Sequence, residues 1–463
     1  MDQLKAGETT VNYEIILQEN DPALNPANRP PINEAIDLIL GHANGYEVPF
    51  AAVPLKEHAE LPEQNLYSCL FGRDSLVISD LLFDVKPHLR MNVISALALD
   101  QGKVFDSQSE EEPGRIAHEV RTMDDPVAKQ LSEHGDWKFP YFGSVDATLI
   151  WMVQIHREAT KNPAVLDIVV GGKTLWERFI SSTSWVLARL DSPSGFIESK
   201  RSNPKGIANQ VWKDSGDSYM HADGTLARGD STASIETVGE TYDAIMAAVA
   251  IQEMKPSNTW PLSMSELTKL ARRLQLSLIA HFWMGDSFAL GLERDSTGVS
   301  VKFESMASNQ GRLLDSGVLS GNEFSEYRKA IAAAMTDSSM LGESGLRTLS
   351  NSHVSYRPGG YHTGSAWPID GVLTARGLLK QGFTKESALV QARIKNAIES
   401  SGGYPEFLRG DWPEKDLINR FIQDVQFEDE SGIRAHTNRI AQPPQIIQGW
   451  TIAAYSWLSH RAS

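Results

Sequence analysis

The chain has 463 residues, of which 41% are hydrophobic and 22% charged, a composition that excludes collagen-like, coiled-coil and low-complexity proteins and indicates a packed globular one. Acidic residues outnumber basic ones by 59 to 43, and the resulting net charge of −16 opposes binding to nucleic acid or to an anionic membrane surface. We therefore expect neither nucleic acid nor a membrane as a partner.

The first 32 residues, which are rich in Asn and Pro near their end, predict an extended N-terminal lead-in. After them, apolar residues recur mostly at the three- and four-residue spacing of helices, and strict alternation is confined to short pieces such as 299–303. In chain order we predict helices over 33–42, 74–83, 91–100, 115–133, 146–158, 175–190, 242–250, 267–282, 323–335, 370–381, 386–400, 415–425 and 446–458. The sequence thus predicts an all-α protein with minor short strands.

The single cysteine, the N-terminus and the apolar segments indicate the cellular compartment in which the protein is expected. Cys69 has no second cysteine with which to form a disulfide, so the sequence does not require an oxidising compartment. The N-terminus lacks the basic start and apolar run of a signal peptide. Charges interrupt the apolar segments within about 12 residues, short of the ~20 that span a bilayer. From these features we expect a cytoplasmic protein.

The helical segments are not divided by any Pro/Ser/Gly-rich linker, so we predict a single domain over 33–463. Because single hydrophobic cores usually stop growing near ~250–300 residues, this domain must extend its core around a ring or along a stack. Long loops at 201–235, 342–368 and 401–414 are rich in Gly, Trp and Asp, and such loops are commonly functional. A ring of helical hairpins with its loops gathered over one end accounts for both features. A helical binding scaffold remains the rival, although no sequence repeat supports a solenoid.

The loops combine carboxylates with aromatic residues, Gly and Asn, which suits a carbohydrate ligand. Flat aromatic surfaces match the C–H faces of a sugar ring, and polar side chains match its hydroxyls. Glycoside hydrolysis in addition needs two carboxyl groups on opposite sides of the scissile bond, one protonated and one ionised. The candidate segments are 71–75, 118–121, 141–148, 209–218, 361–370 and 403–407.

Several candidates also have a structural interpretation. Asp74, Asp146 and Asp370 precede helical patterns and are therefore candidate N-caps. His118 and Glu119 fall within a predicted helix, where an exposed ionic face would explain them. These alternatives remain open on the sequence alone.

The remaining candidates differ in how easily a structural role explains them. Asp214 and Asp217 stand among Ser and Gly and fit turn positions. Trp450 fits a helix core. Glu406 is harder to explain in this way, because it lies between Tyr404-Pro405 and an aromatic residue, where solubility does not require a carboxylate.

The sequence lacks the residue spacing of the common nucleotide-binding, metal-binding and serine-nucleophile motifs. Residues 172–174 resemble the end of a phosphate-binding loop, but Asp167 stands where its first Gly belongs. The sequence has no G-x-G-x-x-G after a strand, no H-E-x-x-H and no G-x-S-x-G. The Asp-rich segment 214–224 lacks the spacing of an EF-hand. We therefore predict no metal and no cofactor.

Taken in order along the chain, these segments are similar to the amylo-α-1,6-glucosidase module of glycogen-debranching-type proteins. The resemblance runs from about residue 65 to the C-terminus. Its motif segments are 72–75, 112–116, 118–121, 141–148, 212–215, 345–349, 361–370, 405–406 and 448–450. That family resembles the wider group of six-hairpin glycosidases, so the resemblance implies an (α/α)6 toroid.

The resemblance also implies a reaction, the hydrolysis of an α-glucosidic bond with inversion, with Asp214 as general acid and Glu406 as general base. We further predict that nearby carboxylates such as Asp217 raise the pKa of Asp214. The implied substrate-binding residues are Arg73, Asp74, His118, Glu119, Tyr141, Asp146, Gln210, Trp212, Asp217, His362, Trp367 and Trp450.

The substrate class is a small oligosaccharide or α-glucoside. Debranching-type proteins usually carry a further N-terminal domain, which is not recognised in this sequence. A short α-glucoside, such as an isomaltose-like disaccharide or a glucoside of a small polyol or organic acid, is therefore as plausible as an α-1,6-linked dextrin.

Two other functions stay open. A phosphorolytic or isomerising enzyme on the same toroid would need a phosphate-binding cluster in place of a base, and Glu406 argues against it. A non-catalytic carbohydrate-binding or scaffold protein would keep its function without Asp214 or Glu406.

Overall fold

The structure, a computed structural model, describes residues 9–14, 29–54, 65–133, 137–227, 231–294, 297–411, 421–428, 434–441 and 444–461. Its α-helices are α1 (Ile32–Leu38), α2 (Gly72–Leu81), α3 (His88–Leu99), α4 (Pro126–Glu133), α5 (Asp146–Lys161), α6 (Leu175–Leu190), α7 (Ile235–Met254), α8 (Met264–Phe282), α9 (Ser325–Thr336), α10 (Pro368–Lys380), α11 (Thr384–Ser401) and α12 (Gly449–Arg461). Its 3-10 helices are η5 (Pro163–Asp167), η6 (Ser308–Leu314) and η7 (Asn322–Phe324).

The strands are short and form small antiparallel sheets. They are β1 (Thr9–Glu14), β2 (Leu40–Ala43), β3 (Tyr46–Pro49), β4 (Ala52–Val53), β5 (Leu70–Phe71), β6 (Glu119–Val120), β7 (Val169–Val170), β8 (Lys173–Thr174), β9 (Thr232–Ser234), β10 (Gly291–Arg294), β11 (Ser300–Phe303), β12 (Leu341–Gly342), β13 (Gly345–Leu346), β14 (Phe421–Glu428), β15 (Arg434–Ala441) and β16 (Ile447–Gln448). The sheet orders are β1-β14-β15, β11-β10-β9, β12-β13, β16-β4, β2-β3, β5-β6 and β7-β8.

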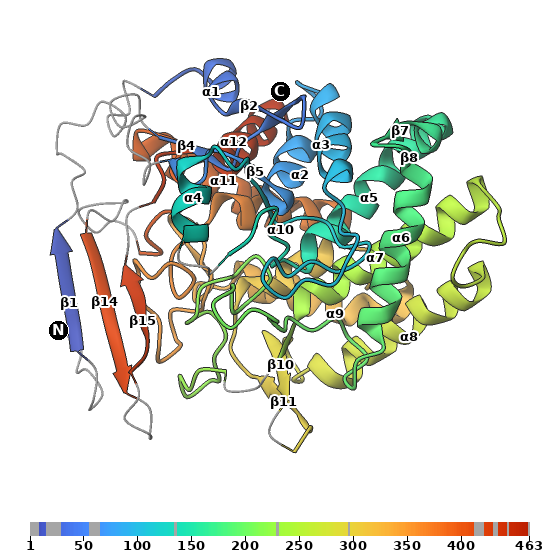
Figure 1. Ribbon diagram of the computed structural model, residues 1–463. Coiled ribbons are helices and arrows are strands. Elements are labelled where there is room, and N and C mark those ends of the chain that lie inside the picture. The colour runs from blue at the N-terminus through green and yellow to red at the C-terminus, as the bar shows by residue number, and fades with distance from the viewer. Residues whose placement is uncertain are drawn as a thin grey trace.

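Helical elements close into an inner ring. Its members α2, α5, α7, η6, α10 and α12 each pack against the next, and α12 packs against α2. Outside this ring, α3, α6, α8, α9, α11 and α1 each pack against an inner member. The chain alternates between the two layers, and the C-terminal α12 closes the ring with the N-terminal α1 outside it. This is an (α/α)6 toroid, as the sequence predicts; Figure 1 shows α10 near the centre of the helical body and α1, α6 and α8 at its edge.

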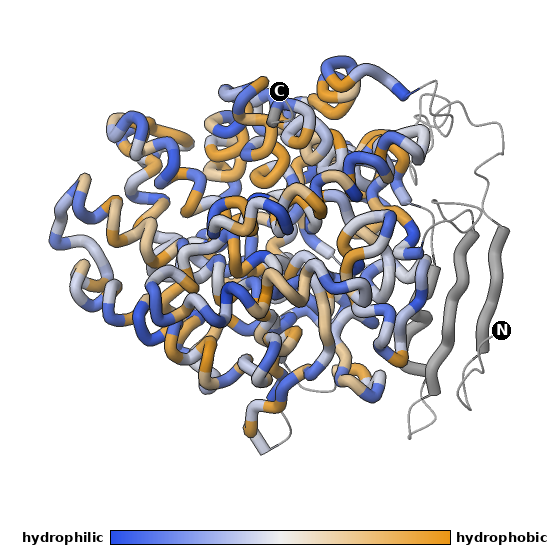
Figure 2. Tube along the Cα trace, turned by 180° about the vertical axis from the view of Figure 1, so that it is seen from behind, coloured by the Kyte–Doolittle hydropathy of each residue, from blue (hydrophilic) through white to orange (hydrophobic). Residues whose placement is uncertain are grey.

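Hydrophobic patterning separates the two layers. In the inner helix α2, nine of ten residues are buried, as expected for a helix enclosed on all sides. The outer helix α6 instead buries one stripe that includes Leu175, Phe179 and Val186. Figure 2 shows the consequence at the edge of the molecule, where hydrophobic and hydrophilic residues alternate along the outer helices.

Helix α6 also shows why local prediction succeeds. Thr174 and Glu177 form a reciprocal capping box at its start, which satisfies backbone N–H groups that have no partner within the helix. The helix ends at Leu190, before Pro193 and a glycine in the left-handed region, Gly195. The predicted boundaries 175–190 are therefore confirmed.

Four predicted helices are wrong in part. Residues 40–42 of the predicted helix 33–42 belong to strand β2, and residues 447–448 of the predicted helix 446–458 belong to strand β16. Of 115–133, only α4 is helical, because 119–120 instead pair with β5 and the amide of His118 donates to the carbonyl of Tyr141. His118 and Glu119 are consequently buried and do not lie on an exposed helix face. Of 415–425, residues 412–420 lie outside the described residues, and 421–425 belong to strand β14, which pairs with β1 and β15.

Alternation between layers makes every inner element run in the same direction, so their N-terminal ends meet at one end of the ring. The first turns of α2, α5, α10 and α12 carry Arg73, Asp146, Asp370 and Trp450.

The described part of the chain contains no helix with the length and apolarity needed to cross a bilayer.

A charge cluster ties the ring together away from that end. Asp80, near the end of α2, accepts hydrogen bonds from Arg90, Arg157 and Arg376 at 2.7, 2.5 and 2.9 Å. Burial disfavours the charged carboxylate, but the three guanidinium groups outweigh it and lower the pKa of Asp80. Asp80 thus joins α2 to α3, α5 and α10, and it lines a cavity of about 320 Å³ between the inner elements.

Candidate active site

Arg73 organises the carboxylates at the N-terminal end of the ring. Its Nη1 lies 3.3 Å from Asp146 Oδ2, its Nη2 lies 3.5 Å from Asp214 Oδ2, and its Nε lies 3.8 Å from Asp74 Oδ2. Arg73 and Asp74 come from α2 and Asp146 from α5, whereas Asp214 is held by the loop that follows α6. The ring thus gathers three predicted carboxylates around the guanidinium group of Arg73.

The three candidate caps occupy a different position from the one predicted. Asp74, Asp146 and Asp370 lie inside the first turns of their helices, where the peptide dipoles favour a negative charge. The N-cap positions of α2, α5 and α10 are held by Phe71, Val145 and Trp367, without a side-chain cap hydrogen bond. The N-cap interpretation is therefore wrong for all three carboxylates.

Glu406 is buried, with 5% of the residue exposed, on the loop after α11. Its Oε1 accepts a hydrogen bond from the Tyr361 hydroxyl at 2.6 Å, and its Oε2 accepts one from the Gln445 amide at 3.2 Å. Burial raises the pKa of Glu406 to about 7; the two hydrogen bonds oppose this shift, and the charges of Asp214 and Asp74 add to it. Tyr361 in turn packs against His362, which lies within hydrogen-bond distance of Ser215, so a chain of contacts connects Glu406 to the residue after Asp214.

Asp214 is the most open of the carboxylates around Arg73, with one third of its side chain exposed. Removal from solvent raises the pKa of Asp214 to about 6, Arg73 opposes the shift, and Asp146 adds to it. A nearby carboxylate thus adds to the shift as predicted, but this carboxylate is Asp146 and not Asp217. The carboxylate of Asp217 instead accepts a hydrogen bond from the Ser215 hydroxyl at 2.8 Å.

The Ser215 hydroxyl also lies 2.8 Å from Nδ1 of His362. Asp217, Ser215 and His362 therefore form a short polar chain beside Asp214. Burial, followed by the charges of Lys213 and Arg73, lowers the pKa of His362 well below its ordinary value. This shift favours the neutral imidazole.

An aromatic wall stands next to these carboxylates, with Trp367 at its centre. The ring of Trp367 stacks on those of His362 and Phe407, with centroids 5.1 and 5.5 Å away. It also meets edges of neighbouring rings at 4.9, 5.8 and 5.9 Å, namely those of Tyr361, Trp212 and Trp450. Trp367 is only 3% exposed, so in this structure these rings form a packed aromatic cluster beside the carboxylates.

The other predicted binding residues lie in a layer around this group, and their described polar contacts are to protein. Tyr141 is fully buried, and its hydroxyl accepts a hydrogen bond from the Ile207 amide at 2.9 Å. Gln210 Oε1 accepts a hydrogen bond from Arg115 at 2.7 Å. Glu119 forms an ion pair with Arg121, and His118 packs edge-on against Phe71. In this structure these four side chains support the loops that carry the carboxylates.

Some residues of the site were missed in the sequence. Tyr361 and Asp370 lie inside a candidate loop, yet nothing local marks Tyr361 as the hydrogen-bond partner of Glu406 or places Asp370 in one cavity with Trp212. Glu240 lies in the interior of α7, without any motif, close enough to Asp146 and Arg73 for their charges to affect its pKa, which burial raises most strongly. Only the ring closure brings these residues together.

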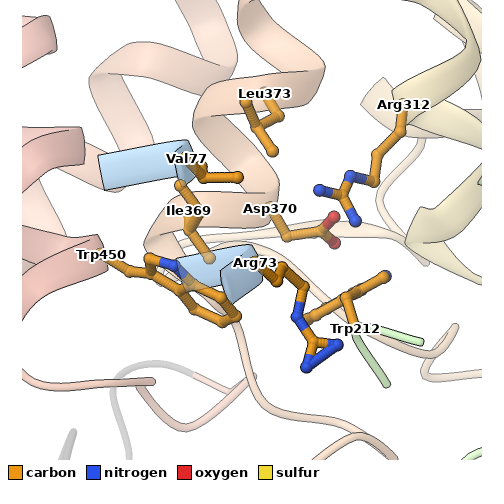
Figure 3. Close-up of a pocket in the computed structure, with 8 residues that line it drawn as sticks. All are labelled: Arg73, Val77, Trp212, Arg312, Ile369, Asp370, Leu373 and Trp450. Atoms are coloured by element: carbon orange, nitrogen blue, oxygen red, sulfur yellow. The ribbon is translucent and has the colours of Figure 1, made fainter. Parts of the chain in front are cut away.

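Beneath the aromatic wall is a small cavity, shown in Figure 3. Its volume is about 10 Å³, which is close to the ~10–15 Å³ that a single water needs. It is lined by Arg73, Val77, Trp212, Arg312, Ile369, Asp370, Leu373 and Trp450. In the described ranges, no group of three or more His, Cys, Asp or Glu side chains is arranged to hold a metal ion.

Solved structures with a similar fold match this chain over nearly its whole length, although their sequence identity to it is low. A crystal structure of GH63 mannosylglycerate hydrolase from Thermus thermophilus in complex with Tris and D-glycerate has a TM-score of 0.59, at 12% identity over 92% of this chain and 98% of that chain. The same hydrolase in complex with glucose has a TM-score of 0.56, at 13% identity over 92% and 98%.

A further structure, described as an uncharacterized conserved protein from Thermus thermophilus, has a TM-score of 0.57 at 12% identity, over 93% of this chain and 100% of that chain. No protein-family model and no curated protein matches the sequence. The chain therefore shares its fold, the (α/α)6 toroid, with structures titled as GH63 hydrolases.

Proposed function

We propose that residues 33–463 form the catalytic domain of an inverting glycoside hydrolase that cleaves an α-glucosidic bond. The observation that carries the proposal is the pairing of Asp214 and Glu406. These two carboxyl groups come from separate loops at one end of the ring, and both have a pKa raised toward neutrality. Hydrolysis with acid and base requires such a pair. The resemblance to amylo-α-1,6-glucosidases supports the same two residues.

In this proposal Asp214 is the general acid. It protonates the glycosidic oxygen as the bond to the anomeric carbon breaks, and it becomes an anion 3.5 Å from the Arg73 guanidinium. That charge favours the ionised product of the acid step. The greater exposure of Asp214 suits contact with a leaving group that extends toward solvent.

Glu406 is the general base in the same step. It removes a proton from water while the water oxygen attacks the anomeric carbon from the opposite face, so an α-glucoside yields β-glucose and the free alcohol. The hydrogen bonds from Tyr361 and the Gln445 amide stabilise the ionised form of Glu406. This stabilisation supports the base role.

Both carboxyl groups titrate near neutral pH, since burial raises the pKa of Glu406 to about 7 and that of Asp214 to about 6. Because the reaction needs one of them protonated and the other ionised, we expect a bell-shaped pH profile of kcat/KM with both limbs near neutral pH.

For the substrate we propose a short α-glucoside whose aglycone is a small polyol or organic acid. The site is acidic and aromatic, which suits an uncharged sugar ring. The structural neighbours are titled as mannosylglycerate hydrolase, with D-glycerate or glucose bound, which supports a small glycoside over a long glucan. The remaining predicted residues, among them Trp367, Trp212 and Arg73, would form the sugar-binding subsite.

The test is a substrate panel with purified protein. It contains α-1,6, α-1,4 and α-1,2 disaccharides, glucosylglycerol, glucosylglycerate, mannosylglycerate and branched dextrin, each with and without phosphate, and released sugar is measured. We expect hydrolysis of a short α-glucoside independent of phosphate. Strict dependence on phosphate would indicate phosphorolysis. Absence of turnover, together with unchanged ligand binding in Asp214→Asn, would indicate a binding protein.

A further inference from the structure

The small cavity under the site contains buried polar atoms without hydrogen-bond partners among the described residues. Both carboxylate oxygens of Asp370 are unpartnered, as are Nε1 of Trp212, Nε1 of Trp450 and Nε of Arg73. All four residues are more than nine-tenths buried and line the cavity. Figure 3 shows the Asp370 carboxylate projecting from α10 toward Arg312 and Trp212.

Neighbouring groups affect Asp370 without satisfying it. Lys213 and Arg312 lower its pKa through their charges, although burial raises it more strongly. The Lys213 ammonium donates to the Thr348 carbonyl at 2.6 Å. Ser308 is near enough to lower the pKa of Asp370, yet its hydroxyl makes no hydrogen bond of normal geometry. Buried polar groups in native proteins are nearly always paired, so a partner is expected in the cavity.

The mixture of atoms defines the chemistry of that partner. A cation would pair with Asp370 but would face Arg73 and Arg312. An anion would pair with the indole N–H groups but would leave both Asp370 oxygens unpaired and add a like charge beside them. A neutral O–H group donates to Asp370 and accepts from an indole N–H, so it serves both kinds of atom.

We infer that this cavity binds a single neutral hydroxyl group, with Asp370 as acceptor and the indole N–H group of Trp212 as donor. Two sources share this chemistry: an ordered water, or a hydroxyl of the bound sugar. The second source rests on the proposed function, and the first does not. Asp370 is then a positioning residue that fixes Trp212, two positions before Asp214.

High-resolution crystal structures of the full chain test the inference in two arms, without ligand and with glucose. Without ligand we expect one density peak within hydrogen-bond distance of Asp370 and of Nε1 of Trp212. With glucose, the peak either persists, which assigns it to water, or is replaced by a sugar hydroxyl. An empty cavity, or an anomalous peak after a bromide or rubidium soak, would overturn the inference even if hydrolysis is confirmed.

A variant supplies the second measurement. Asp370→Asn keeps the shape of the side chain but replaces one acceptor oxygen with an amide group that donates toward the indole N–H. We therefore expect the density peak in the cavity to weaken or move. Hydrolysis, if present, should lose about tenfold in kcat/KM, in line with one lost hydrogen bond to a charged group. The matched control is Asp243→Asn, a carboxylate on α7 that lines the larger cavity and bonds the Gly317 amide. An unchanged peak and unchanged kinetics in Asp370→Asn would contradict the inference.

Discussion

At the scale of single residues, the site depends on how Arg73 and Tyr361 divide the carboxylates between them. Arg73 contacts Asp74, Asp146 and Asp214, whereas Glu406 has no arginine contact in the described residues and is held by Tyr361 and a backbone amide. The two carboxyl groups that the proposal pairs therefore have different surroundings: a guanidinium group lies beside Asp214, and a phenol hydroxyl and a backbone N–H donate to Glu406.

The acid and base assignments make a first prediction. Asp214→Asn and Glu406→Gln should each lower kcat by ~10²–10⁴-fold, the usual effect of losing a general acid or base, while far-UV circular dichroism shows intact folding. The kcat of Asp214→Asn should come closest to the wild-type value on substrates with good leaving groups, because these leaving groups need little protonation. A Glu406→Gln enzyme with full activity would refute the base assignment.

Tyr361 makes a second prediction. Its hydrogen bond lowers the pKa of Glu406, so Tyr361→Phe should raise that pKa. Since the base must be ionised, the limb of the pH profile of kcat/KM that reports Glu406 should move to higher pH, with the aromatic packing on Trp367 preserved. Tyr327→Phe, on the outer helix α9, is the matched control and should leave the profile unchanged. An unchanged pH profile in Tyr361→Phe would show that this hydroxyl does not affect the pKa of Glu406.

At the scale of elements, Asp80 carries the third prediction, because it joins α2 to α3, α5 and α10. Breaking a buried ion pair typically costs about 3–5 kcal/mol, and we expect Asp80→Asn to lose about 3 kcal/mol in urea unfolding, because Arg90 and Arg376 keep other acidic partners. Glu326→Gln, in an exposed pair on α9, should change stability little.

The pH dependence of the stability lost in Asp80→Asn follows from the direction of the pKa shift of Asp80. The pKa of Asp80 is lower in the folded state than its ordinary value of 3.8, so its stabilisation is fully present above that ordinary value and is lost as pH falls through the folded value. The difference between wild type and Asp80→Asn should be constant near neutral pH and shrink below about pH 4. A difference that grows in acid would contradict the ion-pair account.

Which elements the sequence predicts depends on where their stabilising contacts lie. Helix α6 is defined by its own capping box and stripe, so its boundaries are predicted correctly. Residues 119–120 are defined by pairing with Leu70 and Phe71, which local spacing does not reveal, and the predicted helix there is wrong. The same holds at the site: motif loops indicate Asp214 and Glu406, but Glu240 and Arg312 join the site only through ring closure.

At the scale of the whole molecule, the toroid explains why residues far apart in the chain form one site. Parallel inner elements bring their N-terminal ends together, and the intervening loops carry Asp214 and Glu406 to the same end. The structural neighbours share this arrangement of helices at 12–13% identity. A fold alone does not determine a reaction, so the chemistry has to be tested on the two carboxylates and their product.

The most direct test is the anomeric form of the first product. With a separate water between base and sugar, the carboxyl groups of an inverting pair stand ~6.5–9.5 Å apart, against ~5–5.5 Å for a retaining pair. Hydrolysis of an α-glucoside, followed by proton NMR before mutarotation, should therefore show β-glucose appearing first. Initial release of α-glucose would contradict inversion and, with it, the assignment of Glu406 as the base that activates water.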